Sequence, residues 1–399
     1  MSALPDDELP PNMTVASRAA VYLRSGGFVA PLITVLVAFL AGGLVVLATG
    51  HNPIETYQAI FKGTGFNWVF PWLSEDDRTI AALALQQTLI TTTPLILTGL
   101  AVAFAFRCGL FNIGGQGQYI VGSILAVWVG SSFDGMPALL HIVVAILAGI
   151  LSGAAWAGIA GLLKAVTGTN EVITTIMLNW IAIWVGVWLF GLGGPLQNDD
   201  PTRVDVPVSN DVLAGAKLPV FWGDAQLQGL HIGIFIALAA LVVFWVLLNR
   251  TTLGYEVRAV GFSPDAAEAS GINVRRNYIL VMAICGAFAG LGGALDVMGW
   301  QFRIATNDIP ANQLAFFGIA VALLGRNTAI GTLLGALLFA GLINGTSTRN
   351  LDPSVFEPQL ATNLTYMIQG LVVLLISTDV LVVYLLRLRR RRRTQAVAA

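Results

Sequence analysis

Charged residues are scarce in this sequence. Only 11% of the 399 residues are Asp, Glu, Lys or Arg, whereas 56% are hydrophobic, and the mean hydropathy is +0.77. A soluble domain needs far more charge to cover its surface. The scarcity of charge therefore excludes a chain of two or three globular domains, which the length alone would allow.

Residues that commonly bind metals or perform catalysis are also few. His51, His141 and His231 are well separated and lie near the edges of apolar runs, whereas Cys108 and Cys285 lie inside such runs. This spacing supports no metal site, no disulfide framework and no Ser-His-Asp arrangement. The chain has three lysines and no GxxxxGK[ST] loop, so it cannot bind ATP by that route. We expect a chain that is not an enzyme and carries no cofactor.

What the sequence has instead is a series of long apolar runs. A run of about 20 residues is long enough to cross a hydrocarbon core of about 30 Å as a helix. Because the runs are continuous rather than alternating, they predict helices and not a β-barrel. The expected fold class is an all-α integral membrane protein with about ten transmembrane helices in one bundle, over residues 28–49, 79–106, 112–132, 138–163, 171–192, 230–249, 278–300, 311–325, 328–347 and 361–386.

The distribution of basic residues predicts the orientation in the membrane. With a cytoplasmic N-terminus, 15 of the 21 Lys and Arg residues fall on the cytoplasmic side, as the positive-inside rule requires. Both termini are then cytoplasmic, with a head over 1–27, a transmembrane domain over 28–386 and a basic tail over 387–399. The tail contains Arg389 to Arg393 directly after a span, which favours an anchor at anionic lipid over a patch for nucleic acid. We therefore expect the lipid bilayer, and no nucleic acid, among the partners.

Two features concern the packing and the loops. Pairs of glycines four residues apart, such as Gly149/Gly153 and Gly286/Gly290, allow helix backbones to approach closely in lipid. On the predicted outer side lie two long connections, 50–78 and 193–229, and Pro53 to Lys62 predicts a short interfacial helix. The tryptophans of these connections fit the aromatic belt at a membrane surface, and their acidic residues alternatively dock a partner.

The cytoplasmic loop 250–277 contains the pattern of a self-contained short helix. Ser263 is a good N-cap, Pro264 suits the first helical position, and Asp265 favours the positive end of the helix. Gly271 suits the C-terminal stop. A short rigid helix in this loop could receive force from a soluble partner, and the alternative is an ordinary capped loop helix.

Polar residues inside or beside the apolar runs indicate a solute pathway. Glycines interrupt the helical pattern beside Asn112 and Gln116, and interrupted helices at membrane depth often form solute sites, although a plain turn is the alternative. Asn179 shares a helix face with Thr175 and either lines a pathway or bonds to a neighbouring helix. An acid such as Asp296 within a span costs roughly 2.5–3.5 kcal/mol on insertion scales, so we expect it to have a role. The predicted lining is Asn112, Gln116, Asn179 and Asp296.

Four segments, in this order along the chain, carry a resemblance to a known family: Thr93–Gly114, Asn170–Asn179, Arg258–Ile272 and Gly318–Gly325. They resemble the permease subunits of bacterial ABC importers in the branched-chain amino acid/ribose permease superfamily. The resemblance covers roughly residues 79–386 and is strongest to the nucleoside, guanosine-type branch, with simple-sugar permeases as the alternative.

The resemblance implies a non-catalytic subunit of the bacterial cytoplasmic membrane. The implied partners are a second, often non-identical permease, two ATP-binding subunits that carry ATP and Mg²⁺, and an extracytoplasmic substrate-binding lipoprotein. The family often has Glu at the positions of Gln116 and Asp296, and both departures bear on the solute. By resemblance, the loop helix is the coupling element that contacts the ATPase, through Ser263, Pro264, Asp265, Ala266, Ala267 and Gly271.

The sequence therefore supports a hypothesis of alternating access for nucleosides or ribose-like sugars, driven by ATP on partner chains. An ion-coupled secondary transporter is the rival from another class. It is disfavoured because acids inside the spans are sparse, and proton coupling usually needs an ionisable relay.

Overall fold

The computed structural model describes residues 29–224, 229–347, 350 and 357–377, and it divides into two compact units. The first unit comprises residues up to Ala59 together with those from Leu351 onward, and the second comprises Ile60–Asn350. The predicted head over 1–27 and the basic tail over 387–399 lie outside the described residues.

The first unit pairs α2 (Val29–Ala48) with α15 (Pro358–Ser377). The helix α3 (Pro53–Thr64) begins in this unit and confirms the short helix predicted from Pro53 to Lys62. The Tyr57 hydroxyl on α3 donates a 2.6 Å hydrogen bond to the Phe39 carbonyl on α2. Ring contact between the same two residues adds to this junction.

The second unit is built mainly of helices. Over the two units together, each of the ten predicted ranges contains a helix in the described part of the chain. Two short helices, α9 and α10, occupy the loop 250–277, whereas only α10 was predicted. The bounds are α4 (Glu75–Arg107), α5 (Gly115–Ser132), α6 (Ala138–Thr167), α7 (Glu171–Phe190), α8 (Gly233–Arg250), α9 (Thr252–Phe262), α10 (Pro264–Ala269), α11 (Val274–Asp296), α12 (Asp308–Ala311), α13 (Leu314–Leu324) and α14 (Ala329–Gly345).

Length and apolar composition show which helices can cross a membrane. Among the described residues, six can do so: α2, α4, α6, α7, α8 and the segment Val274–Gln301 that contains α11. The apolar parts of α13, α14 and α15 are shorter. The membrane-spanning, helical character is thus confirmed, while the count of about ten spans and the side of each terminus remain predictions.

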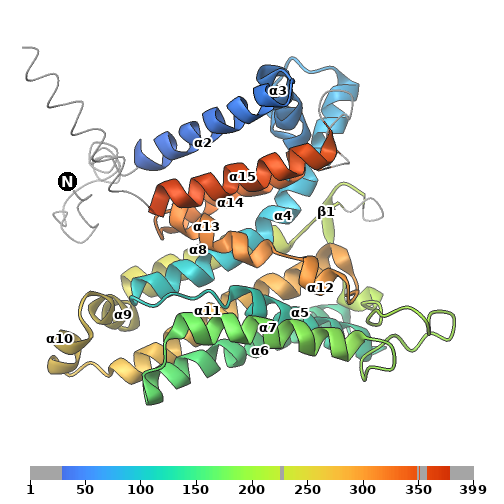
Figure 1. Cartoon of the computed structure of the whole chain (residues 1–399). Coiled ribbons are helices and arrows are strands. Elements are labelled where there is room, and N and C mark those ends of the chain that lie inside the picture. The colour runs from blue at the N-terminus through green and yellow to red at the C-terminus, as the bar shows by residue number, and fades with distance from the viewer. Residues whose placement is uncertain (1–28, 225–228, 348–349, 351–356, 378–399) are drawn as a thin grey trace, which may run out of the picture. The chain divides into compact units, whose positions relative to one another are not determined.

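The helix α11 is the centre of the second unit, where it packs against α4, α5 and α6 (Figure 1). Glycines make the crossing with α6 possible. A Cβ atom at Gly286 would overlap the Gly153 carbonyl oxygen, and one at Gly290 would overlap the Gly149 carbonyl oxygen. The predicted role of these glycine pairs in close helix packing is therefore confirmed.

Replacing Gly286 by valine is expected to force α6 and α11 apart and to destabilise the bundle. Overpacking of this kind costs about 1–3 kcal/mol. The matched control is Gly158→Val on α6, where an added Cβ meets no atom within 4 Å. The thermal midpoint of each purified variant in detergent measures the effect. Equal shifts in the two variants would contradict the packing role of Gly286.

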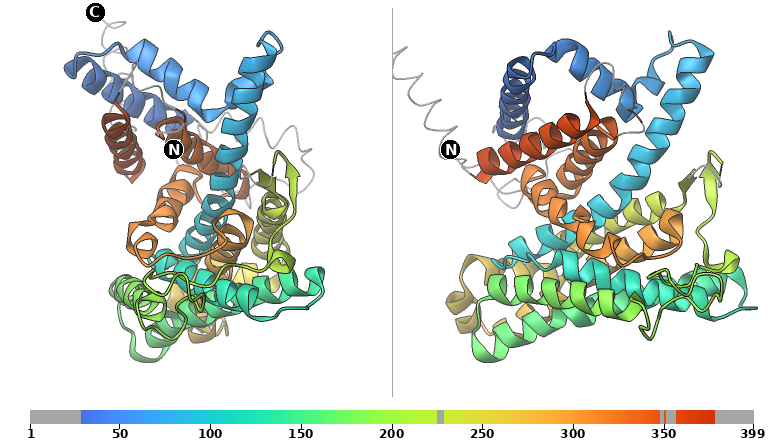
Figure 2. Two further views of the ribbon diagram at one scale, coloured as in Figure 1. Left: turned by 90° about the vertical axis from the view of Figure 1, so that its right-hand side faces the viewer. Right: turned by 45° about the vertical axis from the view of Figure 1, so that its right-hand side comes forward.

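The two ends of the second unit differ in structure. One end carries α9 and α10, and it also holds the C-terminal ends of α4 and α8 and the first turn of α11 (Figure 1). There a Cβ atom at Gly261 of α9 would overlap the Arg107 carbonyl oxygen, so α9 rests directly on the last turn of α4. The opposite end carries α12 and residues 193–224 of the long connection, as the right-hand view of Figure 2 also shows.

The connection 193–229 is fastened to the segment that follows α11. Its strand β1 (Val220–Trp222) pairs antiparallel with β2 (Leu230–His231), which directly follows the connection, in register at Val220 and His231. Backbone N–H groups of the connection donate to carbonyls beyond Asp296. These bonds are Leu218 to Met298 at 3.0 Å, Val212 to Phe302 at 2.8 Å and Ser209 to Ile304 at 2.9 Å.

Candidate translocation site

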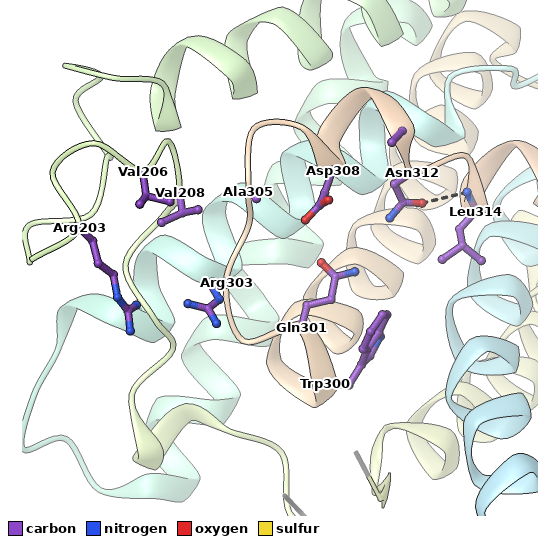
Figure 3. A pocket seen from close by; sticks show the side chains of 11 residues that line it. Arg203, Val206, Val208, Trp300, Gln301, Arg303, Ala305, Asp308, Asn312 and Leu314 are labelled. Carbon is purple, nitrogen blue, oxygen red and sulfur yellow. Dashed lines mark hydrogen bonds between the residues drawn. The ribbon is translucent and has the colours of Figure 1, made fainter. Parts of the chain in front are cut away.

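A pocket of about 810 Å³, drawn close up in Figure 3, is lined in part by α12, which lies at the end of the second unit away from α10 (Figure 1). Two chain segments form its walls, namely residues 203–208 of the long connection and residues 300–314 between α11 and α13. Its polar lining residues are Arg203, Trp300, Gln301, Arg303, Asp308 and Asn312.

The pocket lies where regular α-helix is interrupted between α11 and α13. After Asp296 the helix widens into a π-helical turn, Val297–Gln301, and Phe302 then has a positive φ of 58°. The next helix, α12, has four residues, and the Asn312 side chain accepts a 3.0 Å hydrogen bond from the Leu314 N–H where α13 begins. Irregular backbone of this kind is tolerated at membrane depth only where it is buried inside the protein or lines a cavity.

Asp296 lies behind the pocket and fixes two of its lining residues. The carboxylate is 2% exposed. It accepts hydrogen bonds from Trp300 Nε1 at 2.5 Å, from Gln301 Nε2 at 2.6 Å and from the Tyr119 hydroxyl. Because the carboxylate binds Trp300 Nε1 and Gln301 Nε2, Asp296 orients the indole and the amide. Asp296 does not itself line the pocket.

Gln116 belongs to the same hydrogen-bonded network. Its Nε2 donates to the Asn312 carbonyl oxygen at 2.5 Å, and the Asn312 amide reaches the Tyr119 hydroxyl at 3.4 Å. Its Oε1 is buried and has no hydrogen-bond partner in the described part of the protein. The structure therefore brings two predicted pathway residues, Gln116 and Asp296, together behind one pocket wall.

Asn112 and Asn179 lie elsewhere and fasten the break between α4 and α5. Asn112 and Gln118 exchange two amide hydrogen bonds of 3.0 and 2.9 Å. On α7, Asn179 accepts from the Gly117 N–H at 2.7 Å and donates to the Ile113 carbonyl oxygen at 2.9 Å. Of the two alternatives that the sequence left open for Asn179, these bonds fit the contact with a neighbouring helix. Neither asparagine lines the pocket, so their place in a solute pathway remains a prediction.

The charges around the pocket are largely balanced. Asp211 lies 3.2 Å from Arg203 and 3.6 Å from Arg303, and Asp200 lies 3.9 Å from Arg203. Hydrogen bonds from the Thr202 backbone and side chain, with the nearby Arg203 charge, lower the pKa of Asp200, so it stays ionised. With both cations paired to carboxylates, the pocket does not attract anions strongly.

The sequence analysis missed the residues that line the pocket. Trp300, Gln301, Asp308 and Asn312 fall at or between the ends of two predicted spans, where a plain connection was expected. A usable signal was present, because an aromatic residue, amides and an acid gather there within a short stretch. Their convergence with residues 203–208 depends on tertiary contacts and has no local signal.

His231 packs beneath the π-helical turn, where a Cβ atom at Gly299 would overlap its ring. Burial lowers the pKa of His231 from 6.5 to about 4, so the ring is neutral at physiological pH. Between these two values the unfolded chain binds a proton that the folded chain does not. The neutral His231 ring is therefore expected to make its whole contribution to the free energy of unfolding above about pH 6.5. This contribution is at most about 3 kcal/mol and is lost as the pH falls toward 4. Thermal midpoints measured against pH for wild type and His231→Gln test this, and identical pH slopes would contradict it.

At the other end of the unit, the predicted short helix is confirmed as α10. Ser263 Oγ accepts a 3.3 Å hydrogen bond from the Ala266 N–H, and Gly271 has a φ of 85°. Ala267 is only 4% exposed, because it packs inward, whereas Ala266 is exposed. Phe262, directly before α10, is 84% exposed and presents a large apolar side chain at this end.

A bundle of apolar helices with an open polar pocket at one end and a capped helical loop at the other has the form of a membrane transport subunit. The chain belongs to the permease component family of branched-chain amino acid transport systems, whose model matches residues 84–377. It is thus a multi-pass membrane protein and a non-catalytic transport component. No solved structure matches the chain.

Several ABC transporter permeases are similar to the chain over most of their length. The guanosine ABC transporter permease protein NupP of Bacillus subtilis is 38% identical over 83% of this chain and 89% of its own. The nucleoside ABC transporter permease protein NupB of Lactococcus lactis is 37% identical over 79% and 82%. The glucose ABC transporter permease protein TsgB13 of Haloferax volcanii is 32% identical over 88% and 87%.

Proposed function

We propose that the chain forms the membrane pathway of an ATP-driven importer of nucleosides in the bacterial cytoplasmic membrane. The observation that carries this proposal is the 37–38% identity to guanosine and nucleoside permeases over most of both chains. The pocket supports it, because an indole and amides beside paired charges suit a neutral polar solute with a flat ring.

The two ends of the second unit have different roles in this proposal. The end with α9 and α10 faces the cytoplasm, and the exposed faces of Phe262 and Ala266 contact the ATPase. The pocket faces outward, where a binding protein delivers the solute. The helix α11 runs from the first end to Asp296, so a movement at α10 can reach the groups that hold Trp300 and Gln301.

The basic residues support this orientation. Arg107, Lys164 and Arg250 lie in the last turns of α4, α6 and α8, and Arg275 lies in the first turn of α11. These turns belong to the α9–α10 end, and an excess of Lys and Arg marks the cytoplasmic side. With about ten spans, both termini are cytoplasmic.

The complete importer contains further chains. We propose two ATP-binding subunits that hold ATP and Mg²⁺, a second and non-identical permease, and an extracytoplasmic substrate-binding lipoprotein. The proposed coupling residues are Ser263, Pro264, Asp265, Ala266, Ala267 and Gly271. The proposed pathway includes Asn112, Gln116, Asn179 and Asp296 as supporting or lining groups.

Transport by the reconstituted complex tests the function. The chain is coexpressed with its partner subunits, placed in liposomes with ATP inside, and supplied with binding protein and labelled guanosine, ribose or glucose outside. ATP-dependent guanosine uptake is the expected result. Uptake of a sugar alone would favour the second candidate, which the glucose permease of Haloferax volcanii supports. Uptake by this chain alone under an ion gradient would favour a secondary transporter.

A further inference from the structure

The Asp308 carboxylate is an acceptor without a donor in the pocket. It lines the pocket together with Trp300 and Gln301, and in Figure 3 it points toward the Gln301 amide. Within the described residues it accepts no hydrogen bond and makes no ion pair, whereas Asp211 and Asp296 are both engaged. A solvent-reached carboxylate in a pocket with no protein partner is available to a ligand with N–H or O–H donors.

The neighbouring groups are held in fixed positions. Because Asp296 accepts from both Trp300 Nε1 and Gln301 Nε2, the indole keeps one orientation and the Gln301 Oε1 remains as an acceptor. The pocket thus offers one flat aromatic face and two acceptor groups. Preorganised groups of this kind lose little freedom when a ligand binds.

These groups match one class of nucleobase better than the others. A guanine edge presents two adjacent N–H donors, which a carboxylate can accept in parallel, and its ring can stack on an indole. A uracil edge places a carbonyl oxygen on each side of a single N–H, and those oxygens would face the Asp308 carboxylate. A simple sugar has no aromatic ring to stack on Trp300 and no pair of parallel N–H donors for the Asp308 carboxylate.

We propose that Asp308, with Trp300 as the stacking surface, selects guanine-type nucleosides in this pocket. The proposal rests on nucleoside import as the function and specifies its substrate class. Asp308 is then the residue that determines specificity, and Asp296 is a positioning residue that acts through Trp300 and Gln301.

The test is uptake of labelled guanosine by the complete importer in liposomes, with guanosine, uridine and ribose as competitors. In Asp308→Asn the half-inhibitory concentration of guanosine is expected to rise about tenfold, because one acceptor and the charge are lost, while that of uridine changes less than about twofold. In Trp300→Leu both nucleosides are expected to compete more weakly.

The matched control is Asp134→Asn, which removes the same charge from an exposed residue between α5 and α6 that does not line the pocket. It should leave the ratio of guanosine to uridine unchanged. Equal effects of Asp308→Asn and Asp134→Asn, or equal losses for guanosine and uridine, would overturn the proposal while nucleoside import stands. A wild-type importer that accumulates only sugars would overturn both.

Discussion

Replacing Ala266 by arginine is expected to reduce ATP-driven uptake at least about tenfold. Ala266 is exposed on α10, where the proposed ATPase contact lies. A charged side chain trapped without a partner in such an interface costs about 2–5 kcal/mol, which corresponds to a loss of tenfold or more in affinity. Uptake and the amount of ATPase that copurifies with the chain measure the effect.

The choice of position matters for this test. Ala267 is 4% exposed, so a bulky charge there would disrupt the packing of α10 itself and would not report on the partner. The control is Ala138→Arg, which adds the same side chain at the exposed first residue of α6, away from α10. Normal uptake and normal copurification by Ala266→Arg would exclude this face of α10 as the ATPase contact.

Replacing Asp296 by alanine is expected to lower both uptake and stability. The change leaves Trp300 Nε1, Gln301 Nε2 and the Tyr119 hydroxyl without their acceptor. Each buried polar group without a partner costs about 1–3 kcal/mol, so the loss of stability is a few kcal/mol. Released from Asp296, Trp300 and Gln301 no longer keep the orientation that suits the pocket. Uptake is expected to fall about tenfold or more.

The conservative variant Asp296→Asn separates positioning from stability. Its amide oxygen can still accept hydrogen bonds from one or two of the donors. The thermal midpoint of Asp296→Asn should therefore lie closer to the wild-type value than the midpoint of Asp296→Ala does. If Asp296 positions Trp300 and Gln301, the KM of guanosine uptake should still rise. A KM that stays at the wild-type value in a stable Asp296→Asn importer would contradict the positioning role.

Much of the fold was predictable because its signals are local. Long apolar runs form helices largely independently of their neighbours, and the N-cap Ser263 accepts a hydrogen bond as predicted. Glycines four residues apart predicted close helix packing, which the structure shows where Gly153 meets Gly286. Less of the pocket was predictable. Asp296 and Gln116 were singled out because polar groups in apolar runs need partners, but their partners Tyr119 and Asn312 are distant in the sequence.

By itself, the sequence determined that this chain is a helical membrane protein with a capped loop helix and a few polar groups inside its spans. These properties follow from hydropathy, capping and insertion cost, which act over a turn or a span. Only the tertiary structure decided which polar groups face a cavity and which fasten helices together. Asn112 and Asn179 hold neighbouring segments together through hydrogen bonds. The side chains that face the pocket are Trp300, Gln301 and Asp308. Sequence alone did not show this, because the opposite wall of the pocket comes from a connection about a hundred residues earlier.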